Sequence, residues 1–187
     1  MRYLLVILSI PIILGSGIRT HTPNGFHYPD TRLLVRLVLK GQGMWSSDVE
    51  ELVIRTGAVE SHFKLREGID NGPELGFWQI HPRTARDILF RYLQRPGRQD
   101  WKQNLERILG YKLSWLLERP GRFDDELRNN DILGIALCRL WYMMAPYPIP
   151  DARNLPAQAW LWKKWFNTRK GTGTTRRFIR TARRLRV

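Results

Sequence analysis

Apolar residues recur at helical spacing along most of the chain from Thr31 onward. Residues three and four positions apart share one face of an α-helix, so this spacing predicts helices that pack through one side. The predicted helices span residues 31–40, 47–63, 83–94, 101–118, 131–145, 157–167 and 174–187. Ser47 and Glu50 have the spacing of a capping box, which predicts that the second helix begins at Ser47.

Glycine and proline interrupt this pattern between the helices. Arg-Pro-Gly occurs at 95–97 and again at 119–121, and three prolines fall within 146–150. No segment alternates polar and apolar residues long enough to build a large sheet. The predicted fold class is therefore mainly α, with a small loop or β element between Lys64 and Ile80, after the second helix.

The two ends of the chain differ from the middle and define its predicted organisation. Residues 1–17 hold Arg2, a short apolar run and then small residues, which is typical of a secretory signal or a membrane anchor. Residues 18–30 contain prolines, glycine and histidines and predict a linker. Residues 31–173 form the expected main domain, and 174–187 a basic amphipathic helix.

Composition narrows the class of protein. Of 187 residues 43% are hydrophobic, which excludes a disordered chain. The single cysteine, Cys138, excludes a disulfide framework within the chain, and the four histidines show no metal-ligand spacing, so no metal and no cofactor is expected. The net charge of +14 predicts an anionic partner, such as nucleic acid, a membrane surface or a cell-wall polymer.

One carboxylate lies on the apolar side of the helix over residues 48–63. At about 100° per residue, Glu60 falls among Val49, Val53 and Thr56, whereas Glu50 lies outside this arc. Burial raises the pKa of a carboxyl group, and a glutamic acid that is protonated near neutral pH is a general acid. The alternative is a glutamate that turns to solvent or pairs with a neighbouring cation.

The following loop has a composition suited to a sugar ligand. Residues 71–82 read Asn-Gly-Pro-Glu-Leu-Gly-Phe-Trp-Gln-Ile-His-Pro. Glycine lets backbone approach a ligand, Phe77 and Trp78 offer apolar faces, and Gln79 both donates and accepts hydrogen bonds. The alternative is an ordinary turn that carries a hydrophobic plug.

Together these segments resemble the lysozyme-like superfamily, specifically its soluble lytic transglycosylase type. That family has Glu-Ser at a helix end and then Gly-x-x-Gln-[Ile/Leu/Val]-x-Pro-x-Thr-Ala, and here Glu60-Ser61 is followed by Gly-Phe-Trp-Gln-Ile-His-Pro-Arg-Thr-Ala at 76–85. A looser resemblance to small phage proteins with lysozyme-like domains covers 133–174, and the overall likeness spans 48–179. A later Ala-Tyr-Asn-Ala-Gly segment of the family is missing, with Trp-Phe-Asn-Thr at 165–168 in its place.

The resemblance implies a lysozyme-like fold and cleavage of the β-1,4 bond between N-acetylmuramic acid and N-acetylglucosamine in peptidoglycan. Glu60 would be the catalytic acid and base, with Ser61 beside it. The implied glycan-binding residues are Gly76, Phe77, Trp78 and Gln79, with Asn167 and Thr168 on the opposite wall. Tyr142 lies either near the acid or in the core, and Trp160, Trp162 and Trp165 form either a sugar-stacking surface or an aromatic core.

A transglycosylase needs one carboxylate, whereas most hydrolases need two. Glu67, Asp70 and Glu74 are candidates for the second, or are solvated loop charges. The alternative function is a structural or injection protein of a phage virion with an inactive lysozyme-like domain. The expected location is a virion or the bacterial periplasm and cell wall, with the N-terminus as a potential membrane anchor.

The basic helix at 174–187 predicts binding to an anionic membrane or cell-wall polymer, or else it docks on the domain with solvated arginines. Nucleic acid is the least supported partner, because no DNA-binding motif is present.

Overall fold

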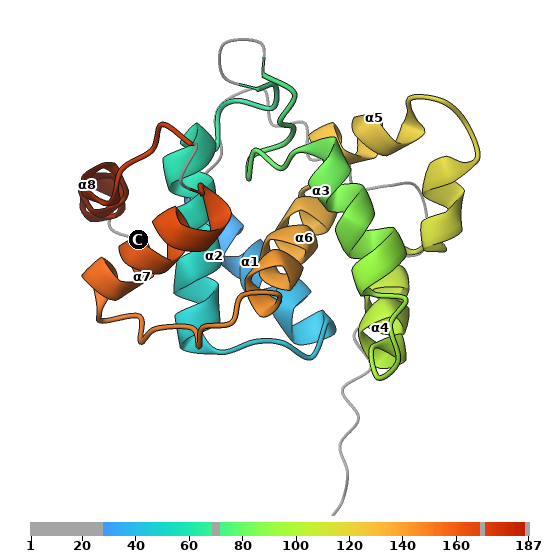
Figure 1. Cartoon of the computed structure of the whole chain (residues 1–187), viewed down its shortest axis with the longest axis horizontal. Helices are drawn as coiled ribbons and strands as arrows, with labels where there is room; N and C mark the ends of the chain where they lie inside the picture. Colours follow the sequence, from blue (N-terminus) through green and yellow to red (C-terminus); the bar gives the residue numbers. More distant parts are fainter. Residues whose placement is uncertain (1–27, 69–71, 169–170, 186–187) are drawn as a thin grey trace, which may run out of the picture.

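The computed structural model describes residues 28–68, 72–168 and 171–185, which form a mainly α-helical domain without a β-sheet in that part of the chain (Figure 1). This confirms the predicted mainly α class. The segment 1–17 and most of the predicted linker lie outside the described residues, as does Asp70. No helix in the described part of the chain has both the length and the apolar character that a membrane crossing requires.

Helix α6 (Asp131–Met143) forms the centre of the domain, between the α1–α2 side and the α3–α4 side (Figure 1). Its sequence is apolar nearly all round, and such a helix is buried on most sides. Ile135, Leu137 and Cys138 are fully buried, and helices α1, α2, α4 and α5 all pack against α6. The prediction of a strongly apolar helix starting at Asp131 is confirmed.

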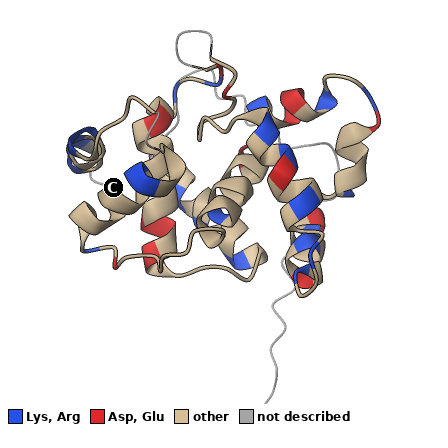
Figure 2. Ribbon diagram, viewed as in Figure 1, with Lys and Arg blue, Asp and Glu red and all other residues tan. Residues whose placement is uncertain are grey.

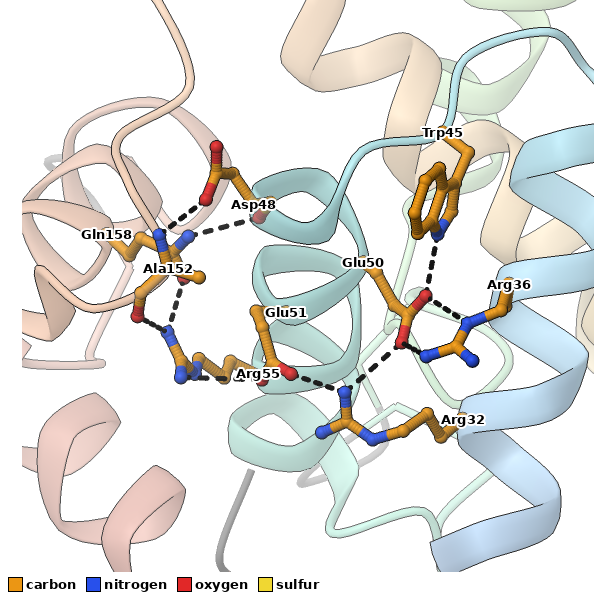
Figure 3. A network of polar contacts seen from close by, with 9 residues as sticks. All are labelled: Arg32, Arg36, Trp45, Asp48, Glu50, Glu51, Arg55, Ala152 and Gln158. Carbon is orange, nitrogen blue, oxygen red and sulfur yellow. Dashed lines mark hydrogen bonds and ion pairs between the residues drawn. The ribbon is translucent and has the colours of Figure 1, made fainter.

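Helices α1 (Tyr28–Gly41) and α2 (Ser47–Ser61) pack side by side and are joined through a buried carboxylate. Glu50 is 2% exposed and accepts hydrogen bonds of 2.8 Å from Arg36 Nε and Nη2, 2.7 Å from Trp45 Nε1 and 3.2 Å from Arg32 Nη1 (Figure 3). Burial alone would raise the pKa of Glu50, but these hydrogen bonds outweigh it and hold the pKa below its ordinary value.

This network corrects the predicted helix cap. The N-cap is Ser46, whose side chain accepts a hydrogen bond of 3.2 Å from the Val49 backbone N–H. Ser47 is the first helical residue, and Glu50 is engaged by the two arginines of α1 rather than by the cap. The Ser-x-x-Glu spacing therefore located the helix start to within one residue but gave the wrong partner for Glu50.

The predicted helix 101–118 is wrong as a single element. Helix α4 (Gln99–Leu109) ends at Gly110, which caps it in the left-handed region at φ 78°. The chain then forms a 3₁₀ turn, η3 (Leu113–Leu117), and a helix that was not predicted, α5 (Arg122–Asn129). Glycine adopts this backbone conformation without steric cost, which is why the helix ends there.

Two helices end in π-helical turns. Helix α3 (Pro82–Asp87) continues as η2 (Ile88–Tyr92), and α7 (Leu155–Leu161) continues as η4 (Trp162–Phe166). These pairs correspond to the predicted helices 83–94 and 157–167. The last helix, α8 (Thr175–Leu185), packs against α2 and α7 at the edge of the domain (Figure 1).

The loop between α2 and α3 contains the only β pairing in the described residues. Leu75 forms isolated antiparallel bridges with Glu67 and with Ile80. The Leu75 and Ile80 backbones exchange hydrogen bonds of 3.1 and 3.0 Å. The predicted small β element is therefore two bridges that fold the loop back on itself.

Candidate active site

Glu60 lies in the last turn of α2 and is partly buried, on the side of that helix toward η4 and α8. Trp162, the first residue of η4, is 1% exposed, and its indole Nε1 donates a hydrogen bond of 2.8 Å to Glu60 Oε1. None of the described residues forms a hydrogen bond with the other carboxyl oxygen. One oxygen of Glu60 is thus held in place, and the other is left for a proton or a ligand.

The surroundings of Glu60 act on its pKa in opposite directions. The net pKa is about 7: burial is the largest effect and raises it, and the negative charge of Glu74 adds to this rise. The hydrogen bond from Trp162 and the positive charge of Arg177 lower the pKa, but by less. A carboxyl group with a pKa near 7 is partly protonated at neutral pH, so it is able both to give and to take a proton.

Arg177 extends from α8 to the end of α2. Its Nη2 donates a hydrogen bond of 3.1 Å to the backbone oxygen of Val59, the residue before Glu60. The last carbonyls of a helix lack partners within the helix, and a cation there is favourable. Arg177 therefore fixes the turn that carries Glu60 and places a positive charge beside the carboxyl group.

The end of α2 is shaped by two residues in the left-handed region. His62 and Phe63 both have φ 53°, which is uncommon for residues other than glycine. The Ser61 hydroxyl donates a hydrogen bond of 2.7 Å to the Phe77 backbone oxygen and accepts one of 3.0 Å from the Phe63 N–H. Ser61 is buried, so it joins the helix end to the loop and does not face a ligand.

Gln79 and the backbone around Gly76, Phe77 and Trp78 were predicted to line a glycan groove, and the structure buries the side chains of Phe77, Trp78 and Gln79. Phe77 and Trp78 are 6% and 1% exposed and pack edge-on against Phe63. Trp78 Nε1 donates a hydrogen bond of 2.9 Å to the Val53 backbone oxygen. The Phe77 and Trp78 rings, which suggested sugar stacking, instead anchor the loop on α2. This agrees with the alternative prediction of a turn that carries a hydrophobic plug.

Gln79 and Gly76 hold the shape of the same loop. Gln79 Nε2 donates hydrogen bonds of 2.8 Å to the Gly76 oxygen and 3.2 Å to the Glu67 oxygen, and the residue has φ 47°. Gly76 has φ 71°, and a Cβ added there would lie 2.6 Å from the Leu127 oxygen. A side chain at position 76 would force the loop away from α5, so glycine is required there.

Tyr142 lies in the core, which was one of its two predicted positions. Its hydroxyl is 2.8 Å from Thr56 Oγ1, and Thr56 Oγ1 donates to the Leu52 oxygen, also at 2.8 Å. Because a threonine hydroxyl has one proton to donate, Tyr142 is the donor to Thr56. Burial raises the pKa of Tyr142, so the phenol stays protonated beneath the site.

Asn167 and Thr168 lie just beyond η4, in a turn fixed by Lys163. Lys163 Nζ donates hydrogen bonds of 2.9 Å to Asn167 Oδ1, 2.9 Å to the Thr168 oxygen and 2.8 Å to the Gly171 oxygen. Thr168 is exposed and has φ 62°. The Asn167 side chain is thus engaged within its own turn, while Thr168 is accessible.

The candidate second carboxylates have different surroundings. Glu67 forms an ion pair of 2.6 Å with Arg128 at the surface. Glu74 is partly buried and close enough to Glu60 to raise its pKa. Of these two candidates, Glu74 is the one whose charge acts on the pKa of Glu60. The described residues contain no group of three or more potential ligands that could hold a metal ion.

Sequence reasoning missed Trp162 and Arg177 as parts of this site. Trp162 was expected in a sugar-stacking surface or an aromatic core, and Arg177 in a basic helix. The one available signal was that a buried indole N–H needs an acceptor.

Comparisons of the chain with protein-family models, with curated proteins and with solved structures find no match.

Proposed function

We propose that this chain is a peptidoglycan-cleaving enzyme with a lysozyme-like fold, and that Glu60 is its general acid and base. The observation that carries the proposal is the state of Glu60: a partly buried carboxyl group at a helix end, with a pKa of about 7 and one oxygen held by Trp162. The resemblance of Glu60-Ser61 and residues 76–85 to lytic transglycosylases supports the choice of substrate.

The proposed reaction uses both protonation states of Glu60. The protonated carboxyl group gives its proton to the glycosidic oxygen between N-acetylmuramic acid and N-acetylglucosamine, and the bond to the anomeric carbon breaks. The resulting carboxylate then takes a proton from the attacking hydroxyl. In a transglycosylase that hydroxyl belongs to the same sugar and gives a 1,6-anhydro product, whereas in a hydrolase it belongs to water.

The test is mass spectrometry of purified peptidoglycan after incubation with the wild type and with Glu60→Gln. The amide of this variant keeps an oxygen that accepts the Trp162 hydrogen bond but cannot transfer a proton, so we expect products from the wild type alone. Glu67→Gln is the matched control, because it removes an exposed carboxylate from the adjacent loop, and it should remain active.

The products also identify the nucleophile. Anhydro-muropeptides indicate a transglycosylase, for which Glu74→Gln should retain activity. Reducing-end products indicate a hydrolase, for which Glu74 is the expected second carboxylate. Absence of products from the wild type would contradict the proposal and would favour a structural role in a virion.

A further inference from the structure

Helix α8 has one face buried in the domain. Phe178 is 0% exposed and Ala182 1% exposed, and the Phe178 ring lies 5.3 Å from that of Trp162. The helix packs on both α2 and α7. Its apolar side is therefore already used, and it is not available to enter the acyl region of a membrane as an interfacial helix would.

The opposite face of α8 consists of arginines. Arg176, Arg180, Arg183 and Arg184 are all exposed. At about 100° per residue they fall within an arc of about 100°, centred nearly opposite Phe178 and Ala182. The helix contains no acidic residue. We call these four residues the arginine face.

The arginine face carries charge that the protein does not neutralise. None of the four forms an ion pair or a side-chain hydrogen bond with any other residue that the structure describes. By contrast, Arg32 and Arg36 on α1 and Arg66 in the loop all bind carboxylates. Clustered like charges repel each other, so such a row is favourable when it meets an anionic partner.

The position of α8 favours a flat partner. The helix lies at the edge of the molecule, beyond α2 and α7 (Figure 1), and its ribbon is largely basic (Figure 2). Arg176 and Arg184 are about 12 Å apart along the helix axis at 1.5 Å per residue. A row of this length on one face of an edge helix can bring all four guanidinium groups to one plane of phosphates, to which arginine forms paired hydrogen bonds.

We propose that the arginine face binds the surface of an anionic phospholipid bilayer by charge alone, with α8 still docked on the domain. A lipid surface is favoured over nucleic acid because the sequence also contains the apolar run at residues 3–14. A hydrophobic anchor alone or a basic patch alone binds a membrane weakly, and the two together give stable attachment of a protein to the membrane surface. This proposal does not depend on catalysis by Glu60.

The test measures binding of the full chain to lipid vesicles by co-sedimentation. The anionic vesicles contain phosphatidylcholine and phosphatidylglycerol at a ratio of about 7:3. Vesicles of phosphatidylcholine alone measure the binding that does not depend on lipid charge. The test variant is R176Q/R180Q/R183Q/R184Q. The control is R83Q/R91Q/R95Q/R119Q, which removes the same charge from exposed positions outside α8 and keeps residues 3–14 unchanged.

Each arginine near an anionic surface strengthens binding about fivefold. We therefore expect the test variant to lose at least about 100-fold in affinity for the anionic vesicles, and the control less than about tenfold. The difference in affinity between the wild type and the test variant should disappear between about 0.1 and 0.5 M salt. Circular dichroism should show both variants folded, because only exposed side chains change.

Three results would overturn the proposal. Equal losses in the two variants would show that only total charge matters. A difference between the wild type and the test variant that persists at about 0.5 M salt would show that α8 does not bind by charge alone. Binding of the wild type to duplex DNA that is tighter than to the vesicles, and is lost in the test variant, would make nucleic acid the partner.

Discussion

At Glu60, burial and the neighbouring charges act on one carboxyl group in opposite directions. Burial and Glu74 favour the protonated form, while Trp162 and Arg177 favour the carboxylate. The balance places the pKa at about 7, where the group is available in both forms. Substituting any of these neighbours should therefore shift the pKa of Glu60.

Arg177 provides a direct test of this balance. Replacing it with glutamine removes a positive charge beside Glu60, so the pKa of Glu60 should rise by up to about one unit. The pKa of Glu60 is measurable by NMR of its carboxyl carbon. If Glu60 is the acid of the proposed glycan cleavage, the pH above which cleavage declines should rise by the same amount.

Two variants separate charge from structure at this position. R177K keeps the charge and should leave the pH of this decline nearly unchanged. R176Q removes an exposed charge from the adjacent position and should also leave it unchanged. A decline that moves equally in R176Q and R177Q would show that the effect comes from net charge and not from Arg177 itself.

Sequence periodicity predicted the candidate acid but not its partners. Glu60 could be proposed because helical spacing within one segment is readable from sequence. Trp162 and Arg177 lie more than 100 positions further along the chain, and their approach to Glu60 depends on how α2, η4 and α8 pack. The sequence left the positions of Phe77 and Trp78 open, because an aromatic residue in a glycine-rich loop fits a ligand site and a hydrophobic plug equally well.

Among the helices, α1 and α2 are held together by more than apolar contact. Glu50 is buried between Arg32, Arg36 and Trp45, and Glu51 connects Arg32 to Arg55 at 3.4 Å (Figure 3). The network continues to α7 and the segment before it, because Arg55 donates hydrogen bonds to Gln158 in α7 and to the Ala152 oxygen. The elements on one side of the domain are therefore linked through a few charged side chains.

Glu50→Gln should destabilise the protein by about 2–3 kcal/mol, because it leaves two arginines beside a buried neutral amide. Glu51→Gln is the control, because its carboxylate is more exposed, and it should cost less than about 1 kcal/mol. Urea unfolding at neutral pH measures both. Equal losses in the two variants would contradict a special role for the buried carboxylate.

The stabilisation by Glu50 has a predicted pH dependence. The pKa of Glu50 is lowered in the folded state, so its stabilisation is complete above the ordinary carboxyl pKa and is lost as the pH falls through the lowered value. The difference between wild type and Glu50→Gln should therefore shrink in acid.

Most helices could be predicted, and the exceptions have local causes. Segments such as 131–145 are long and strongly patterned, and their helices formed where expected. The segment 101–118 is also apolar-rich, but its helix ends at Gly110. The prediction extended the helix past this position, because one glycine within an apolar-rich segment is a weak sign of a helix end. Helix α5 was missed because eight residues with two buried side chains, Phe123 and Leu127, give little periodic signal.

For the whole molecule, the raised pKa of Glu60 has a cost in stability. Between its ordinary value of 4.5 and about 7, the folded protein keeps a proton on Glu60 that the unfolded chain has released. The free energy of unfolding therefore falls as the pH rises through this window, and the loss is complete above it.

Glu60→Gln removes this cost, so it should be more stable than the wild type by about 3 kcal/mol at pH about 8 and nearly equal to it at pH about 4. Denaturant unfolding at the two pH values checks this. If Glu60→Gln is less stable than the wild type at both pH values, then the Glu60 carboxyl group stabilises the fold, and its burial does not destabilise it.

The global fold was predictable only at the level of class. Composition and periodicity predicted a mainly α domain, but the arrangement of α6 between two groups of helices depends on long-range contacts that spacing does not contain. The sequence also left open whether the last helix docks on the domain. The structure docks it, and in doing so brings Arg177 to the end of α2.

The central claim, that Glu60 gives a proton to a glycosidic bond, is tested most directly by the pH dependence of kcat/KM for cleavage of purified peptidoglycan. The account predicts a decline above pH about 7 in the wild type, as Glu60 loses its proton, and no cleavage by Glu60→Gln at any pH. A rate that stays constant through that range, or cleavage by Glu60→Gln at the wild-type level, would contradict it.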